Sequence, residues 1–137
     1  MKKTNVSRLL TAVLLFGLGL TTGLVAQTNG DLATRMELKR TDLSGAPNME
    51  VVVSTSETKP GEMIPMHSHH GIEAVYIIQG ATVQVPGKDP ITMATGGNGL
   101  NLRDINHAGY KNVGDTTLKL FTVHIVDKSK PLYEFVK

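Results

Sequence analysis

Short runs of β-branched and aromatic residues, separated by turn residues, constrain the fold of this chain more than any other feature. Turn-forming Gly, Pro, Asn and Asp lie between these runs, in KPGE, QGA, PGKDP, GGNG and NVGD. No window of a dozen residues keeps a helical period. The runs are MEVVVSTS (Met49–Ser56), IEAVYII (Ile72–Ile78), ATVQV (Ala81–Val85) and TTLKLFTVHIV (Thr116–Val126). This pattern predicts strands of an all-β sandwich or closed barrel.

The length of the chain fits one such domain. At 137 residues it leaves too little for a second independent core. We assign the barrel to residues 49–137. Residues 27–48 are polar and rich in turn residues, with a short alternation in MELKRTDL, and we interpret them as a leading arm or an edge strand.

The first 26 residues have the pattern of a signal peptide. Basic residues at Lys2, Lys3 and Arg8 precede the apolar run Leu9–Leu20, and small residues follow, with Ala26 a plausible cleavage point. The alternative is an uncleaved membrane anchor, but threonines interrupt the run and no strongly polar stop follows it. We therefore expect a periplasmic or secreted product that has no membrane attachment after cleavage.

Charge and cysteine content limit the classes of partner and of metal ligand that we expect. Removal of residues 1–26 would take away three of the 14 basic residues and none of the 12 acidic ones, which leaves a net charge of minus one. A near-neutral domain without a basic stripe gives no reason to expect binding to nucleic acid. The chain has no cysteine, so any metal site must use nitrogen and oxygen ligands.

Both faces of the run Ile72–Ile78 are apolar. Glu73, Val75 and Ile77 share one face of the expected strand, and Ala74, Tyr76 and Ile78 share the other. We expect the barrel interior to cover one face, and another sheet or a second subunit to cover the other. A homodimer is the expected assembly.

Three of the five histidines lie within four positions, in MHSHHGIE (Met66–Glu73). His67 and His69 are two residues apart, so an extended strand aims both imidazoles to the same side, and Glu73 is the natural carboxylate partner. A third imidazole must come from elsewhere, with His107 the best candidate and His124 the second. Such a set suits iron, manganese, nickel, copper or zinc better than calcium or magnesium. The alternative is that these histidines are surface-loop residues that bind nothing.

The segment GEMIPMHSHHGIEAVYIIQG, from Gly61 to Gly80, resembles the first motif of the cupin superfamily at every defining position. The second motif is matched in part by GGNGLNLRDINHAGYKN, where Leu102 and Asp104 replace the expected proline and glycine and Asn112 falls one residue late. The resemblance covers nearly all of the chain after Met49. It implies a single jelly-roll β-barrel of six to eight strands, with a metal bound inside by His67, His69, Glu73 and His107.

The resemblance leaves the function open, because small cupins include dioxygenases, isomerases, lyases and binding proteins. A metal-dependent enzyme of dioxygenase type, acting on a small oxygenated molecule, is the preferred hypothesis. A non-catalytic periplasmic protein that binds a metal or small ligand is the alternative, as is a cupin isomerase or lyase.

The remaining histidines and the methionines near the motif receive other roles. We expect His70 to face away from the site as a loop residue. We expect His124 to be a hydrogen-bonded core residue or, alternatively, to lie in the pocket behind the ligands. Met63, Met66 and Met93 are interpreted as barrel filler rather than as soft ligands.

Overall fold

The alternating sequence of the two longest strands places them at the centre of the fold. In β2 (Met49–Thr58) and β9 (Leu118–Asp127) every second side chain is buried, and the two strands pair over ten consecutive residues. These features come from a computed structural model, which describes residue 32 and residues 34–137. The expected signal peptide, residues 1–26, lies outside the described residues.

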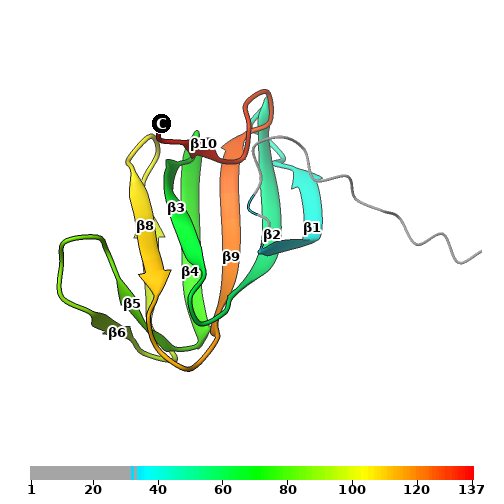
Figure 1. The fold of residues 1–137 in the computed structure, drawn as a ribbon. Helices are drawn as coiled ribbons and strands as arrows, with labels where there is room; N and C mark the ends of the chain where they lie inside the picture. The colour runs from blue at the N-terminus through cyan, green and yellow to red at the C-terminus, as the bar shows by residue number, and fades with distance from the viewer. Residues whose placement is uncertain (1–31, 33) are drawn as a thin grey trace, which may run out of the picture.

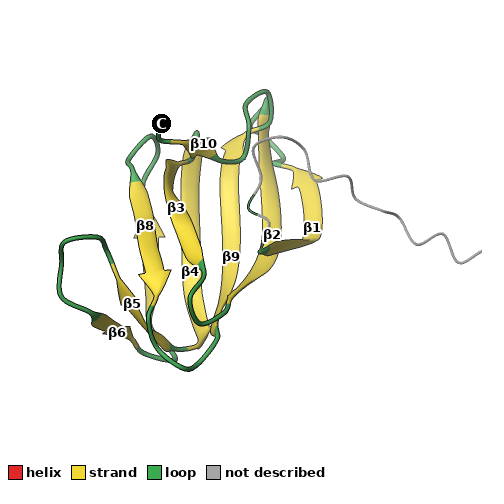
Figure 2. Ribbon diagram, in the orientation of Figure 1, coloured by secondary structure: helices red, strands yellow, loops and turns green. Residues whose placement is uncertain are grey.

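The described residues form ten strands in two antiparallel sheets of five strands each (Figures 1 and 2). The first sheet has the order β1 (Arg35–Asp42), β2, β9, β4 (Gly71–Gln79), β7 (Asn98–Asn101). The second has the order β10 (Glu134–Phe135), β3 (Met63–Ser68), β8 (His107–Asn112), β5 (Ala81–Gln84), β6 (Ile91–Met93). The prediction of an all-β jelly-roll fold is therefore confirmed, whereas the expected six to eight strands are ten among the described residues. None of the described residues forms an apolar helix long enough to cross a membrane.

The two sheets face each other and bury two apolar clusters between them. One consists of Ile77, Ala81, Val83, Leu118 and Leu120. The other consists of Leu32, Ile64 and Tyr133. Tyr110 packs against both clusters, so it lies where they meet.

Glycines at the two ends of the first motif are required by the backbone. Gly61 has a φ of 85°, in the left-handed region that other residues avoid. Gly80 lies so close to β6 that an added Cβ would be 2.3 Å from the carbonyl oxygen of Met93. Both therefore hold turns that bring the motif's strands into the two sheets.

The departures from the second motif are accommodated by the local structure. Asp104 adopts a φ of 59°, the left-handed conformation that the expected glycine would provide, and Asp tolerates it better than most residues. Asn112 is fully buried, and its side-chain amide donates to the carbonyl oxygens of Thr58 and Thr116. Its side-chain oxygen accepts from the backbone amide of Gly114. Asn112 therefore stabilises the turn before β9.

Candidate metal centre

Strand register brings the histidines and the glutamate together from both sheets. His67 on β3 is the direct neighbour of His107 on β8. In the opposite sheet, Glu73 on β4 lies between His124 on β9 and Asn101 on β7. His69 follows the end of β3 and is completely buried. The site is thus built from five elements, of which two belong to the second sheet and three to the first.

Three of the imidazoles are oriented by backbone carbonyls. The Nδ1 atom of His67 donates to the carbonyl oxygen of Pro65 at 2.8 Å. In the same way, His69 donates to the carbonyl of Leu132 at 2.6 Å, and His107 to that of Ile105 at 3.0 Å. Because a neutral imidazole carries one N–H, each ring presents the lone pair of its Nε2 atom. Metal-binding histidines are held by this kind of outer hydrogen bond.

The rings of His69, His107 and His124 converge on the carboxylate of Glu73. Its Oε2 atom is 3.4 Å from Nε2 of His69 and 3.4 Å from Nε2 of His107. Its Oε1 atom is 3.3 Å from Nε2 of His124. The Asn101 amide donates to Oε2 at 2.6 Å and so fixes the orientation of the carboxylate. Two atoms that each ligate one ion at about 2.1 Å are separated by roughly 3.0 to 3.4 Å.

These contacts leave buried acceptors facing one another. The Nε2 atoms of His69 and His107, and both ring nitrogens of His124, are buried without a hydrogen-bond partner among the described residues. A neutral imidazole lone pair and a carboxylate oxygen repel each other unless a proton or a metal ion lies between them. The donor set therefore fits a divalent ion of the borderline class, which prefers imidazole and carboxylate. The residues form two possible ligand groups that share His69: His67, His69, His107; and His69, Glu73, His124.

The protonation states agree with a ligand set. Burial lowers the pKa of His67 to about 4, so this ring is neutral near pH 7. Burial also lowers the pKa of His124. For Glu73, burial alone would raise the pKa, but contacts with His107, His124 and His69 outweigh it and hold the pKa below its usual value. The carboxylate is therefore ionised, and the neutral rings of His67 and His124 can act as ligands. For His107, burial lowers the pKa but contact with the Glu73 carboxylate outweighs it and raises the pKa, so a proton and a metal ion would compete for this ring.

The structure brings together all four residues selected from the sequence, His67, His69, Glu73 and His107. His124, which the sequence left between two roles, is completely buried and faces Glu73. Asn101 was not selected at all, and the pairing of β4 with β7 that places it beside Glu73 has no signal in the sequence.

His70 lies apart from the cluster. Its Nδ1 atom is 2.8 Å from a carboxylate oxygen of Asp104, and a quarter of its side chain is exposed. Two of the three methionines are not barrel filler: Met63 and Met66 are 50% and 41% exposed. Each of them directly precedes a buried residue of β3, Ile64 and His67 respectively, and is directed to the other side of the strand. Met93 lines an interior cavity.

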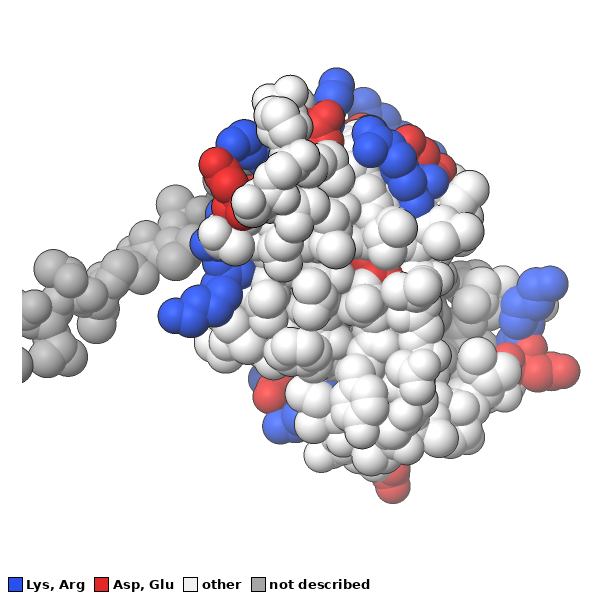
Figure 3. Space-filling model, turned by 180° about the vertical axis from the view of Figure 1, so that it is seen from behind, with Lys and Arg blue, Asp and Glu red and all other residues white. Residues whose placement is uncertain are grey.

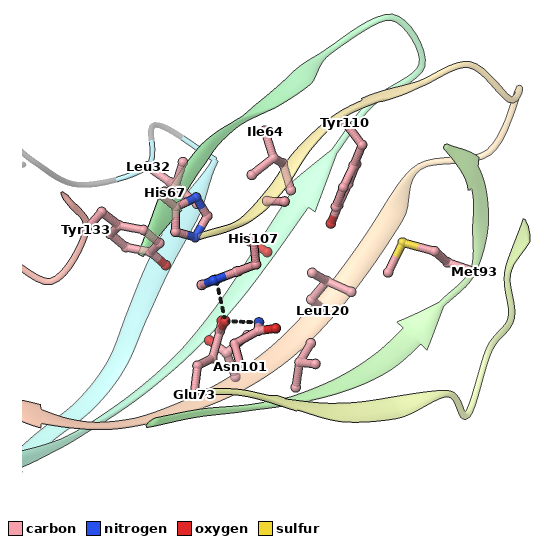
Figure 4. Close-up of a pocket in the computed structure, with 14 residues that line it drawn as sticks. Leu32, Ile64, His67, Glu73, Met93, Asn101, His107, Tyr110, Leu120 and Tyr133 are labelled. Carbon is pink, nitrogen blue, oxygen red and sulfur yellow. Dashed lines mark hydrogen bonds and ion pairs between the residues drawn. The ribbon is translucent and has the colours of Figure 1, made fainter. Parts of the chain in front are cut away.

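That cavity lies against the open side of the cluster and measures about 160 Å³. His67, Glu73 and His107 form part of its wall, whereas His69 and His124 do not reach it. Figure 4 shows the site residues at one end and Met93 and Tyr110 at the other. A bound ion would thus have His69 and His124 on the side away from the cavity. It would face the cavity on the side of His67, Glu73 and His107.

Two facing antiparallel sheets with an inward-facing histidine and glutamate cluster define a cupin-type double-stranded β-helix with a candidate metal site. No protein-family model matches the sequence, and no curated protein matches it either. Several solved structures share the fold of this chain.

A protein of Klebsiella pneumoniae with a double-stranded β-helix domain aligns with a TM-score of 0.52 and 18% identity, covering 75% of this chain and 83% of that one. The polyketide cyclase RemF from Streptomyces resistomycificus aligns with a TM-score of 0.51 and 17% identity, over 68% of this chain and 74% of its own. The DMSP lyase DddQ from Ruegeria pomeroyi aligns with a TM-score of 0.50 and 15% identity, covering 63% of this chain and 43% of its own. At these identities the similarity establishes the fold alone.

Proposed function

We propose that the protein binds a divalent transition-metal ion through His67, His69, Glu73 and His107, and acts as a metalloenzyme of dioxygenase type on a small oxygenated molecule. The observation that carries the proposal is the convergence of unpartnered Nε2 atoms on Glu73. Anchoring of the Nδ1 atoms to backbone carbonyls supports it, because the rings cannot turn away without losing those hydrogen bonds.

A bound ion would supply Lewis-acid polarisation of substrate oxygens and, for a redox-active metal, one-electron chemistry. The residues of the chain provide the surroundings. Asn101 holds the Glu73 carboxylate in place, and the low pKa of Glu73 favours a ligand role over that of a proton acceptor. The apolar lining from Ile64 and Leu120 keeps bulk water away from a substrate in the cavity.

Metal binding is tested by elemental analysis of the mature protein purified without chelators, followed by titration of the metal-free protein. We expect about one equivalent of iron, manganese, nickel, copper or zinc per chain. His107→Ala should lower the metal affinity by about 100-fold or more. Loss of a residue that only hydrogen-bonds a ligand lowers it by about 10- to 100-fold, and loss of the ligand itself should cost more.

His70→Ala is the matched control, since His70 belongs to the same sequence cluster but contacts Asp104 instead of Glu73. It should leave the affinity unchanged. Equal losses in the two variants, or a wild-type protein that takes up no metal, would contradict the ligand set.

Catalysis is tested by following oxygen uptake with enediol and phenolic compounds after loading with each metal. A non-catalytic binding protein is the second candidate, because among the described residues the only titratable side chains on the cavity wall outside the cluster are the phenols of Tyr110 and Tyr133. Ligand-dependent stabilisation without turnover across the panel would favour that second function. Turnover without oxygen uptake would indicate an isomerase or lyase.

Export belongs to the same proposal. The signal-peptide pattern in residues 1–26 supports a periplasmic or secreted location. Amino-terminal sequencing of the protein recovered from the periplasm or the medium tests it, and we expect a start near residue 27. Recovery of the full-length chain from the cytoplasm would contradict export.

A further inference from the structure

The volume of the cavity limits what can bind beside the cluster. About 160 Å³ is available, and an engineered apolar protein cavity of roughly 150 Å³ holds a benzene molecule. One six-membered ring with small substituents therefore fills the space. A fused or multi-ring compound would have to extend out through the open side of the cavity or displace its walls.

The wall of the cavity is chemically divided. At one end lie His67, Glu73, His107 and Asn101, which suit an oxygenated group. The body of the cavity is apolar, and Figure 4 shows Ile64, Leu120 and Met93 around it. This division favours a ligand with polar oxygens on one side and an apolar ring next to them.

The hydroxyl side chains of Ser56, Thr122 and Tyr110 interrupt this apolar lining. The side chain of Tyr110 lines the cavity, and its hydroxyl points inward (Figure 4). Tyr110 is paired with Ile64, three residues along the strands from the pair formed by His67 and His107. A span of three residues in a strand is about 10 Å, so the hydroxyl faces the cluster across the cavity.

A backbone irregularity explains why Tyr110 points inward at all. In a regular strand, residues three apart point to opposite faces, so His107 and Tyr110 could not both face the interior. Ala108 and Gly109 have φ values of 61° and 69°, and these two left-handed residues shift the alternation by one. For Ala108 this conformation is unfavourable. The chain thus adopts an unfavourable backbone at the point that places the phenol in the cavity.

The Tyr110 hydroxyl remains available to a ligand. Burial raises the pKa of Tyr110 to about 12, with a further contribution from the charge of Glu73, so the phenol is neutral at ordinary pH. No hydrogen bond joins it to another residue in the described part of the chain. A neutral phenol can both donate and accept a hydrogen bond, and a buried phenol is stabilised when it finds a hydrogen-bond partner.

We propose that the cavity accepts one-ring 1,2-dioxygenated compounds whose two oxygens face the cluster and whose ring carries a further hydrogen-bonding group opposite, where Tyr110 binds it. This inference rests on the proposed metal site and deepens it by naming the substrate class. Catechol is the parent compound, and 1,2,4-trihydroxybenzene adds the third group. Fused-ring diols and flavonols exceed the volume of the cavity and should bind more weakly.

Binding to the zinc-loaded mature protein tests the size limit, since zinc is not redox-active and the ligand is not consumed. Calorimetry without oxygen compares catechol, 1,2,4-trihydroxybenzene and 2,3-dihydroxynaphthalene. The naphthalene diol should bind roughly tenfold or more weakly, because overfilling a packed interior is unfavourable. Met93→Ala removes bulk at the far end and should restore its binding. Equal or tighter binding of the two-ring diol to the wild type would overturn the size limit.

The role of Tyr110 is tested by Tyr110→Phe, which keeps the shape and removes the hydroxyl. The variant should bind 1,2,4-trihydroxybenzene about fivefold more weakly, as expected for the loss of one neutral hydrogen bond, and bind catechol as the wild type does. A similar loss for both compounds, or for neither, would overturn the assignment. The same contrast can be measured in the wild type alone, where the third hydroxyl should improve affinity over catechol.

Metal content measured on the same samples separates this inference from the proposed function. If the protein takes up no metal but still selects one-ring compounds through Tyr110, the metal proposal fails and the specificity assignment stands. If the metal is bound and neither selectivity nor Tyr110 dependence is seen, the specificity assignment fails alone.

Discussion

At the scale of single residues, His124 is the side chain whose contacts differ most from those of its neighbours. The other three imidazoles of the cluster donate to backbone carbonyls, whereas neither ring nitrogen of His124 has a hydrogen-bond partner among the described residues. Its Nε2 atom is 3.3 Å from Glu73. We expect His124 to take part in binding the ion, either as a ligand or by orienting Glu73.

His124→Phe should therefore separate metal affinity from stability. Metal affinity should fall by tenfold or more, the range for loss of an outer partner. The metal-free protein should lose little stability, because an aromatic ring replaces a buried polar ring whose nitrogens lack hydrogen bonds. Titration with zinc and thermal unfolding without metal provide the two measurements.

The matched control is Ile125→Phe, one residue along β9 on the outer face, which should leave metal affinity unchanged. Unchanged zinc affinity in His124→Phe would show that His124 is a core residue with no part in the site. X-ray absorption of the loaded protein would count the imidazoles and distinguish a ligand from an orienting residue.

The neutral state of His67 predicts how the metal-free protein responds to pH. Its pKa is about 4 in the folded protein against 6.5 for an ordinary histidine, because burial disfavours the charged ring. Between these values the unfolded chain binds a proton that the native state does not, so stability rises with pH. The contribution is complete above pH 6.5 and is lost as the pH falls towards 4.

We expect the unfolding midpoint of the metal-free protein to drop by roughly 5 °C or more between pH 7 and pH 5, as for a loss of about 1 kcal/mol in a domain of this size. The lowered pKa of Glu73 also makes the folded protein less stable as the pH falls, but only below the usual pKa of a glutamate. The raised pKa of His107 has the opposite effect and favours the folded protein at low pH. His67→Phe removes the titrating ring and should flatten the dependence. A midpoint independent of pH in the wild type would mean that His67 is not buried neutral.

Residue spacing alone could identify part of the site. His67, His69 and Glu73 lie in one short stretch, where strand parity and the motif point to the same side. His124 could not be decided, because its role depends on the pairing of β9 with β4. Tyr110 was missed, since ordinary alternation from His107 places it outside and nothing in the letters HAGY indicates two left-handed residues.

At the scale of elements, the irregularity in β8 is the feature that joins the metal site to the cavity. Ala108→Val should lower the free energy of unfolding by about 1–2 kcal/mol, because a β-branched residue tolerates a left-handed backbone even less than alanine. Ala108→Gly should keep or raise stability, since it removes the strain. Chemical denaturation provides the measurement.

Ala74→Val is the control for added bulk in a strand, because Ala74 lies in β4, where valine is favoured, on the face away from the interior. It should change stability by less than about 0.5 kcal/mol. If both valine variants had the same small effect, the left-handed conformation of Ala108 would not be a constraint on the fold.

Strand prediction succeeded where β-branched and aromatic residues form a continuous run. The four β-branched runs correspond to β2, β4, β5 and β9, since alternation over several residues is a strong signal. The short strands β6, β7 and β10, of three, four and two residues, were not found. They are defined by pairing with distant neighbours, and so few residues carry no period of their own.

At the scale of the whole molecule, the sheet formed by β1, β2, β9, β4 and β7 has an apolar outer surface. Large side chains on this surface are between 39% and 64% exposed: Met36, Ile72, Tyr76, Ile78, Leu100 and Ile125. We call this set the outer apolar face. Seen from behind, charged side chains lie mainly around the margin and the centre is largely uncharged (Figure 3). Monomeric proteins rarely leave so many neighbouring apolar side chains in water.

A second copy of this chain is the occupant that we expect on the outer apolar face. An uncharged face requires no partner of opposite charge, two such sheets can pack face to face, and a two-fold arrangement uses the same patch twice. Sedimentation of the mature protein at micromolar concentration should therefore show a dimer. Tyr76→Lys, at the centre of β4, should give a monomer, because it would bury a charge at the interface.

Ile91→Lys is the matched control, since Ile91 is 59% exposed but lies on β6 in the other sheet, and it should remain dimeric. Dissociation of both variants would indicate a general loss of stability. A monomeric wild-type protein at high concentration would assign the face to a different partner. Because Glu73 lies on the inner side of the same strand as Tyr76, a Tyr76→Lys monomer that still binds zinc would also show that the metal centre is complete within one chain.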